Sequence, residues 1–419
     1  MLDRKSAPQF VEIIPGNLPT PEIVTLDNGV PLVHFDKVNQ EVLRIELVFK
    51  AGKWYESKVG TSYFTSHLLD KGTTKRSSFE IAEIFDQFGS SFEISAGSDF
   101  VSVSLYTLTN NIDKVLPLFC EITRYPSFPV SEFTLLKDIF RQNLKVNNEK
   151  SSYLASKIIR HNIFGSTHPY GNSVTESDLD CLTHQDLVGF FQARFNLHEV
   201  YITGKMDSGL LKILSKNLSE FPVSHQADII PTISESPESK TQHIQKSESL
   251  QSSIRLGKKV INRSNPDYPA LVLLNHILGG YFGSRLMKNI REEKGLTYGI
   301  NSSIHALKHD AFFLIGTDVN KENRTVAFSE IKSEIMRLQE NIDLAELETA
   351  KRHLLGSLQL ETANPFSVLE KIKTIRLHNL DSDFYSALYK GIQTSSPHTL
   401  TRIAQTYLNE SSFFELSVG

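Results

Sequence analysis

Residues 60–73 of the chain read GTSYFTSHLLDKGT, and this stretch gives the strongest indication of the fold. Its residues have helical character, and Gly60 and Gly72 frame them. Residues four apart lie on one face of a helix, so Tyr63 and His67 are expected side by side. Taken alone, a histidine in such a helix is expected to hydrogen-bond a neighbour rather than to hold a metal ion.

Residues 63–67 occupy the frame of the H-x-x-E-H motif of zinc peptidases. In that motif two histidines on one helix face bind zinc, and the glutamate activates the attacking water. Here Tyr63 stands in place of the first histidine and Ser66 in place of the glutamate, and only His67 is retained. The rest of the chain must decide whether this is a degenerate enzyme motif or an unrelated helix.

Composition sets broad bounds on structure and function. A chain of 419 residues suggests two or more domains, and a net charge of -4 gives no electrostatic case for a nucleic-acid or membrane partner. Two cysteines make no disulfide framework. Residues 1–16 lack the apolar region of a signal peptide. A cytoplasmic location is therefore expected, and removal of a leader from a longer precursor stays compatible with the sequence.

Two similar series of predicted elements divide the chain. The first contains a hairpin over 25–33 and further strands over 42–50, 100–105 and 200–204, with helices between them. The second contains strands over 298–305, 311–317 and 413–418, again with helices between. Linker-like composition separates the two series. We expect an N-terminal domain over 1–222, a linker over 223–253 and a C-terminal domain over 254–419.

Four motifs resemble those of the pitrilysin/insulinase family of zinc peptidases, especially its short members, which include the mitochondrial processing peptidase subunits. Residues 60–73 match the family's G-x-x-H-F-x-E-H-x-x-x-x-G-T pattern in register, and residues 164–171 look like its F-x-x-H-P-Y-G segment. LGGYFGSRL at 278–286 and IREEKGLTY at 290–298 are similar to its L-G-G-x-x-x-S-R-L and I-R-E-x-x-G-L-x-Y signatures. The resemblance implies an α+β fold with two homologous α/β-sandwich domains, each an antiparallel-rich sheet covered by helices.

The resemblance also locates a third zinc ligand. Active members carry a glutamate at the position that is Asn143 here, 76 residues after His67. An amide oxygen is a poor, uncharged substitute for a carboxylate on zinc. Tyr63, Ser66, His67 and Asn143 are therefore expected to be degenerate metal-site positions, and we expect neither a metal nor another cofactor in this chain.

The family's substrate-binding strand carries Asn-Ala at the positions that are Glu93 and Ile94 here. This feature is altered as well. An edge strand can still bind a peptide by β-augmentation, because backbone groups make the hydrogen bonds. Glu93 and Ile94 are thus candidate substrate-binding residues.

The second half retains residues of the family's active site, whereas the first half has lost its zinc ligands and general base. In the family, an arginine and a tyrosine seven residues apart hydrogen-bond the substrate carbonyl and the developing oxyanion, and Arg291 and Tyr298 stand at that spacing. Taken singly, Arg291 is better explained as a cation at a helix C-terminus, and Tyr298 as a half-buried strand residue. Held together inside one long motif, they are the candidate catalytic pair.

Some short family members divide the labour between two chains, and this sequence resembles the subunit with a degenerate zinc motif. The resemblance implies a catalytically incomplete subunit of a heterodimeric zinc metallopeptidase, which supplies Arg291 and Tyr298 to a homologous short partner with an intact H-x-x-E-H. Zinc is expected in that partner, and unfolded peptides are the expected substrate. The alternative is a non-catalytic structural or peptide-binding homologue, as a homodimer or as a core subunit of a complex.

Overall fold

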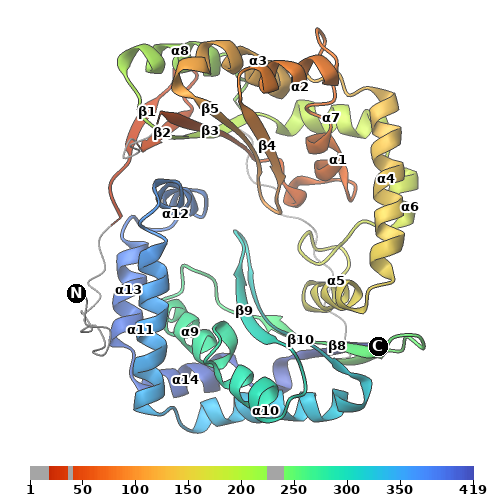
Figure 1. Cartoon of the computed structure of the whole chain (residues 1–419), viewed down its shortest axis with the longest axis vertical. Coiled ribbons are helices and arrows are strands. Elements are labelled where there is room, and N and C mark those ends of the chain that lie inside the picture. Colours follow the sequence, from red (N-terminus) through yellow and green to blue (C-terminus); the bar gives the residue numbers. More distant parts are fainter. Residues whose placement is uncertain (1–17, 36–40, 224–239) are drawn as a thin grey trace, which may run out of the picture.

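The computed structural model describes residues 18–35, 41–223 and 240–419, which form two sheets covered by helices (Figure 1). The first sheet contains β1 (Glu22–Thr25), β2 (Pro31–Phe35), β3 (Val42–Phe49), β4 (Ser91–Ala96), β5 (Val101–Leu108) and β6 (Leu197–Thr203). The second contains β7 (Thr241–Ile244), β8 (Gln251–Lys259), β9 (Ile300–Ala306), β10 (Ala311–Asn320) and β11 (Phe414–Val418). The predicted fold class is confirmed.

The two sheets share one topology. The strand order is β1-β2-β6-β3-β5-β4 in the first sheet and β7-β11-β8-β10-β9 in the second. β2 pairs with β6 in parallel, β7 pairs with β11 in parallel, and the other neighbours are antiparallel. The second sheet thus repeats the order and directions of β2-β6-β3-β5-β4. This repetition is what the two similar series of elements predict.

Helices and short helical turns fill the connections of both halves. Those of the first half are η1 (Lys53–Tyr55), α1 (Thr61–His67), α2 (Ser78–Gln87), η2 (Thr109–Asn111), α3 (Ile112–Arg124), α4 (Val130–Asn148), α5 (Ser151–Phe164), α6 (Glu176–Cys181), α7 (His184–Arg194) and α8 (Ser208–Leu218). Those of the second half are α9 (Tyr268–Asn275), η3 (His276–Gly280), η4 (Met287–Glu293), η5 (Lys321–Asn323), α10 (Arg324–Glu340), α11 (Leu344–Leu360), α12 (Pro365–Leu377), α13 (Phe384–Thr394), α14 (Pro397–Tyr407) and η6 (Glu410–Ser412). No helix in the described ranges is both long and apolar enough to cross a lipid bilayer.

Each half lends one helix to the sheet of the other half (Figure 1). α12 of the second half packs against the first sheet in a buried cluster: Val33, Phe35, Val48, Tyr201, Val368, Leu369, Ile372 and Leu377. α5 of the first half packs on β8 and β11. A Cβ at Gly257 of β8 would lie only 2.6 Å from Ile163 Cδ1 of α5, so glycine permits this close approach. The halves are therefore interlocked.

Buried ion pairs reinforce the junction made by α12. Arg376 donates to both carboxylate oxygens of Glu199 at 3.0 Å, and Glu199 also accepts a hydrogen bond from the Tyr201 hydroxyl. Lys373 donates to Glu46 at 2.8 Å, and Glu46 is only 2% exposed. Carboxylates this deeply buried are stable only when they are paired. The pairs thus tie α12 to the first sheet.

The segment 223–253 is only partly a connection. Residues 224–239 lie outside the described residues, but β7 and the first residues of β8 belong to the second sheet. The expected linker was therefore too long at its C-terminal end, because polar strands such as β7 resemble linkers in composition.

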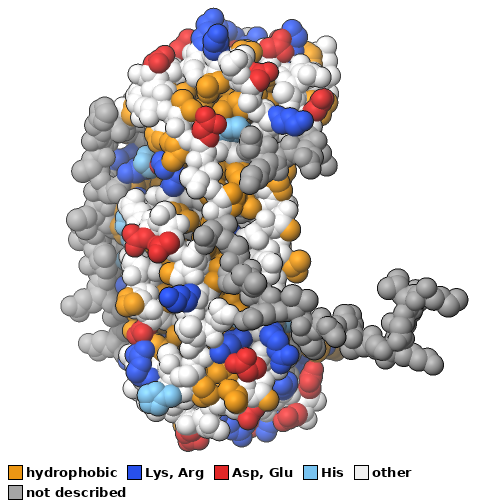
Figure 2. Space-filling model, turned by 90° about the vertical axis from the view of Figure 1, so that its left-hand side faces the viewer, with side chains coloured by type: hydrophobic (Ala, Val, Ile, Leu, Met, Phe, Trp, Pro, Cys, Tyr) orange, Lys and Arg blue, Asp and Glu red, His pale blue; other side chains and the backbone are white. Residues whose placement is uncertain are grey.

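The face shown in Figure 2 carries basic and acidic side chains that are interspersed. A nucleic-acid-binding surface requires basic side chains gathered in a patch or stripe. The described residues visible on this face form no such patch.

Candidate functional site

Glycine and a buried carboxylate define the start of α1. Gly60 adopts a φ of +97°, a left-handed conformation that glycine favours. The Glu56 carboxylate accepts hydrogen bonds from the N–H groups of Gly60 at 3.1 Å and Ser62 at 2.8 Å, so it caps the first turn. Burial raises the pKa of Glu56 to about 7. The framing glycine is thus accounted for by the backbone, whatever the chemistry of the helix.

Tyr63 and His67 lie side by side on α1, as their spacing predicts. Their rings are stacked with centroids 3.9 Å apart. Nδ1 of His67 donates a hydrogen bond to the carbonyl oxygen of Tyr63 at 2.8 Å. Only Nε2 is then left as a possible ligand atom, and a tyrosine ring fills the place that a second histidine would take.

Ser66 points into the core. Its side chain is fully buried, and its hydroxyl donates to the carbonyl oxygen of Ser62 at 2.7 Å, one turn earlier. A hydroxyl held in this way has no basicity with which to deprotonate water. Nothing at this position replaces the general base of an H-x-x-E-H helix.

Asn143 lies exposed on α4, one turn after Phe140, whose ring packs against Tyr63 with centroids 5.1 Å apart. α4 therefore runs beside α1, as expected if Asn143 occupies the family's third zinc-ligand position. Zinc in proteins takes three or four nitrogen, sulfur or carboxylate ligands. Within the described residues, no three His, Cys, Asp or Glu side chains are grouped to hold a metal ion. One imidazole nitrogen and one amide oxygen do not fit zinc.

We expect the purified chain to retain far less than one zinc ion after dialysis against a weak chelator. The double variant Tyr63→His, Asn143→Glu should gain close to one zinc ion per chain, because together with His67 it supplies three ligands on helices that already lie together. Elemental analysis measures both contents. One equivalent of zinc on the unaltered chain would contradict this description of α1.

β4 forms the edge of the first sheet beside α1. It pairs only with β5, in a register that opposes Glu93 to Ser104 and Ile94 to Val103. Glu93 is exposed, and Ile94 packs partly against the core. The other edge of β4 is unpaired within the described sheet, which is the condition for β-augmentation.

Arg291 lies in η4 with its guanidinium over the ring of Phe282, at 4.7 Å from the ring centroid. Cation–π contact of this kind orients an arginine without using its N–H donors. No hydrogen bond or ion pair joins the guanidinium to any residue in the described ranges. Phe282 is itself 63% exposed, so the pair forms a charged surface feature with free donors. This contact was not predicted from the sequence.

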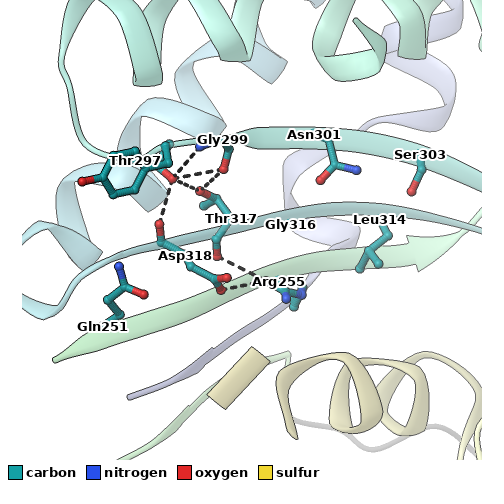
Figure 3. A pocket seen from close by; sticks show the side chains of 11 residues that line it. Gln251, Arg255, Thr297, Gly299, Asn301, Ser303, Leu314, Gly316, Thr317 and Asp318 are labelled. Carbon is teal, nitrogen blue, oxygen red and sulfur yellow. Dashed lines mark hydrogen bonds and ion pairs between the residues drawn. The ribbon is translucent and has the colours of Figure 1, made fainter. Parts of the chain in front are cut away.

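Tyr298 is 93% exposed and lies two residues before the start of β9. The expectation of a half-buried strand residue is therefore wrong for its side chain. It lines a pocket of about 360 Å³ over β8, β9 and β10, together with the side chains drawn in Figure 3. Its hydroxyl has no hydrogen-bond partner among the described residues. An exposed tyrosine with a free hydroxyl is available to a bound molecule.

The candidate residues fall into two groups. Tyr63, Ser66 and His67 lie on α1 next to the β4 edge, whereas Arg291 and Tyr298 belong to the second half. In Figure 1 the edge strands β4 and β9 approach each other across the centre of the molecule. No described contact joins the two groups.

The H-P-Y-G segment at 168–171 contributes to the junction between the halves. The Tyr170 hydroxyl donates to Asp99, and it accepts a hydrogen bond from the N–H of His309 at 3.3 Å. His309 also stacks on Trp54, with ring centroids 3.9 Å apart. The loop between β9 and β10 is thereby held against the first half. Sequence alone indicated a motif here but not its partner.

His168 makes the junction sensitive to acid. Its Nδ1 accepts a hydrogen bond from the N–H of Tyr170 at 3.0 Å, and burial, with Lys259 nearby, lowers its pKa to about 4. As the pH falls below about 6.5, His168 is protonated in the unfolded chain but still neutral in the folded chain. The folded state therefore loses stability as the pH falls from about 6.5 to about 4.

We expect His168 to account for a loss of about 1–2 kcal/mol in the free energy of unfolding between pH 7.5 and pH 5. The variant His168→Gln keeps an acceptor for the Tyr170 N–H but cannot be protonated, so its loss should be smaller by that amount. Urea unfolding at the two pH values measures both. Equal losses in the two proteins would refute the assignment.

Comparison with protein families gives two matches, which together span most of the chain. The model described as "Insulinase (Peptidase family M16)" matches residues 33–177, and the model described as "Peptidase M16 inactive domain" matches residues 182–354. The first covers α1, α4 and the strands β3, β4 and β5 of the first sheet, and the second covers η3, η4 and the Arg291–Tyr298 segment.

Several curated proteins and solved structures are similar over nearly their whole length. The "Uncharacterized zinc protease YmxG" of Bacillus subtilis is 24% identical over 356 residues, 83% of this chain and 86% of that protein. The "Non-peptidase homolog YmxG" of Helicobacter pylori is 24% identical over 398 residues, 92% of this chain and 91% of its own.

Two crystal structures share the fold. The "peptidase M16 inactive domain" of Pseudomonas fluorescens has a TM-score of 0.84 at 23% identity and covers 96% of this chain and 98% of its own. A protease of Helicobacter pylori has a TM-score of 0.85 at 20% identity, over 96% of this chain and 99% of its own. The two family matches, which together span most of the chain, assign it to the insulinase (M16) family of peptidases.

Proposed function

We propose that this chain is the non-metal subunit of a heterodimeric zinc metallopeptidase and that it supplies Arg291 and Tyr298 to the active site of a homologous zinc-binding partner. One observation carries the proposal most directly. The two side chains that are equipped for oxyanion stabilisation are presented with free donors, whereas the helix that would hold the metal is packed, capped and lacks ligands.

The chemistry of the pair fits acyl transfer. A guanidinium supplies a permanent charge and several donors, and a phenol supplies one hydroxyl donor. Both stabilise the negative charge that develops on a peptide carbonyl oxygen during attack by water. The water must be activated elsewhere, because Ser66 and Asn143 provide neither a base nor a complete metal site. A partner in trans supplies both functions.

A peptide can reach such a site as an added strand. The unpaired edge of β4 lies beside α1, and extended peptides bind to sheet edges through main-chain hydrogen bonds. This mode favours unfolded substrates, since most strands of a folded protein are already paired. Glu93 and Ile94 then border the substrate through the backbone of β4, with their side chains on opposite faces of the sheet.

The test uses a homologue from the same organism that carries an intact H-x-x-E-H. Each chain is assayed alone and in mixtures with an unstructured fluorogenic peptide. Cleavage is expected only in the mixture and should saturate at one chain of each kind per complex. Full activity of the homologue alone, unchanged on addition of this chain, would contradict the proposal.

The same experiment separates the proposal from its main alternative. A structural or peptide-binding homologue would form a complex, or bind the peptide, without raising the rate of cleavage. Size-exclusion chromatography of the mixture distinguishes a failure to assemble from assembly without activity. The second result would favour the non-catalytic role.

A further inference from the structure

Tyr298 is placed just beyond the end of a strand ladder. The pairing of β9 with β10 ends at Ile300, which lies opposite Thr317. Gly299 and Tyr298 therefore lack the ladder hydrogen bonds that fix the residues after them. A glycine next to an unpaired residue would leave the tyrosine free to move, unless other groups hold the backbone.

Beyond the last paired residue of β9, two threonine hydroxyls make the hydrogen bonds that hold the backbone (Figure 3). The N–H of Gly299 donates to Oγ1 of Thr297 at 3.2 Å, and Oγ1 of Thr317 donates to the carbonyl oxygen of Gly299 at 2.9 Å. Oγ1 of Thr297 in turn donates to the carbonyl oxygen of Asp318 at 2.8 Å. Both backbone groups of Gly299 are thus satisfied by side chains, and the turn is tied to β10.

The threonine on β10 is buried, whereas the tyrosine whose backbone it holds is exposed. Thr317 is only 4% exposed on β10, whereas Tyr298 is 93% exposed. The two threonine oxygens also lie 3.0 Å apart, and both contact the backbone of Gly299, so the two side chains and this glycine form one connected network. A buried hydroxyl whose hydrogen bonds are all made keeps a fixed rotamer. The backbone group to which it is bonded is then held in one position as well. The tyrosine side chain receives its position entirely through the backbone.

We propose that Thr317 is a positioning residue for Tyr298: its hydroxyl, acting with that of Thr297 on the backbone of Gly299, sets where the Tyr298 phenol meets the substrate carbonyl. This inference rests on the proposed function of Tyr298. Oxyanion donors act only when they lie within hydrogen-bond reach of the developing charge, so a small displacement lowers the rate steeply.

The test compares two substitutions in the assembled complex with the zinc-binding partner. Thr317→Val keeps the shape and strand preference of threonine but removes the hydroxyl, and we expect kcat to fall by about 10-fold with KM changed by less than about twofold. Thr317→Ser keeps the hydroxyl and should restore most of the rate. Equal losses in both variants would mean that packing, not the hydrogen bond, matters.

A double substitution excludes a merely structural effect. In a Tyr298→Phe background, Thr317→Val should cause no further loss of kcat, because the group that it positions is already absent. An additional 10-fold loss would overturn the inference, since Thr317 would then act on something other than Tyr298.

Hydrogen exchange of the isolated chain reports on the network without any partner. Thr317→Val should raise the exchange rate of the amides in residues 297–299 and leave that of β8 unchanged. Unaltered exchange would overturn the inference whatever the activity shows. If Tyr298→Phe is fully active while the exchange result holds, the proposed function fails but the network is confirmed. If Tyr298→Phe is impaired and Thr317→Val is not, the inference alone fails.

Discussion

Replacing Arg291 by alanine is expected to lower kcat/KM of the mixed complex by about 100-fold or more, and Tyr298→Phe should have an effect of similar size. Each change removes donors that stabilise the oxyanion, and water reproduces them poorly. Neither side chain is buried against this chain's core, so folding and assembly should be unaffected. Steady-state kinetics on the fluorogenic peptide, with equal amounts of complex, measures the loss.

Matched substitutions on the same chain serve as controls. Arg141→Ala and Tyr125→Phe alter an arginine and a tyrosine that lie in the first half, at α4 and after α3. Both variants should retain the rate of the unaltered complex within about twofold. Full activity of Arg291→Ala and Tyr298→Phe would show that the pair takes no part in catalysis.

Removing Arg376 is expected to lower the free energy of unfolding by about 3 kcal/mol, the typical effect of leaving a buried charge unpaired. Glu199 is buried, and Arg376 satisfies both of its carboxylate oxygens across the contact between α12 and the first sheet. In Arg376→Met the apolar part of the side chain remains, so the loss reports on the charge. Urea unfolding at pH 7.5 measures it.

The comparison is with an exposed ion pair. Arg141 pairs with Asp180 at 2.9 Å, and the Asp180 side chain is 69% exposed. Arg141→Met should lower the free energy of unfolding by less than about 1 kcal/mol. Similar small effects of the two substitutions would mean that the ion pairs of α12 do not hold the halves together.

The sequence was sufficient to predict the fold class. Motif spacing placed Tyr63, Ser66 and His67 on one short helix, and counting placed Asn143 on a neighbouring helix. Alternation and turn residues located most strands of both sheets, because those signals are local. The roles of Arg291 and Tyr298 were inferred from the family resemblance and remain to be tested.

The exchange of helices between the halves was beyond sequence reasoning. The apolar positions of α12 indicate one face that packs against a core, but helical periodicity does not say which element that face meets. The same holds for α5, whose place is set by Gly257 on β8, some 90 residues later in the chain. The predicted domain boundaries therefore follow the order of the elements along the chain, but not the packing of α5 and α12.

The surroundings of the candidate pair could not be predicted either. Arg291 contacts Phe282, nine residues earlier, and Thr317 contacts Gly299, 18 residues earlier, through turns whose geometry no motif describes. Because the pattern indicated a strand from Tyr298 onward, its side chain was expected to be half-buried and not 93% exposed. Such details depend on where one element ends relative to its neighbour, which is the least predictable feature of a sequence.

The most direct test of the central claim is a cryo-electron microscopy structure of the mixed complex with a peptide bound and the partner's general base substituted to prevent cleavage. We predict that the Tyr298 hydroxyl and the Arg291 guanidinium lie about 2.7–3.1 Å from the oxygen of the zinc-bound carbonyl. A complex in which both side chains lie on the outer surface, away from the partner's zinc, would contradict the assignment of this chain as a catalytic contributor.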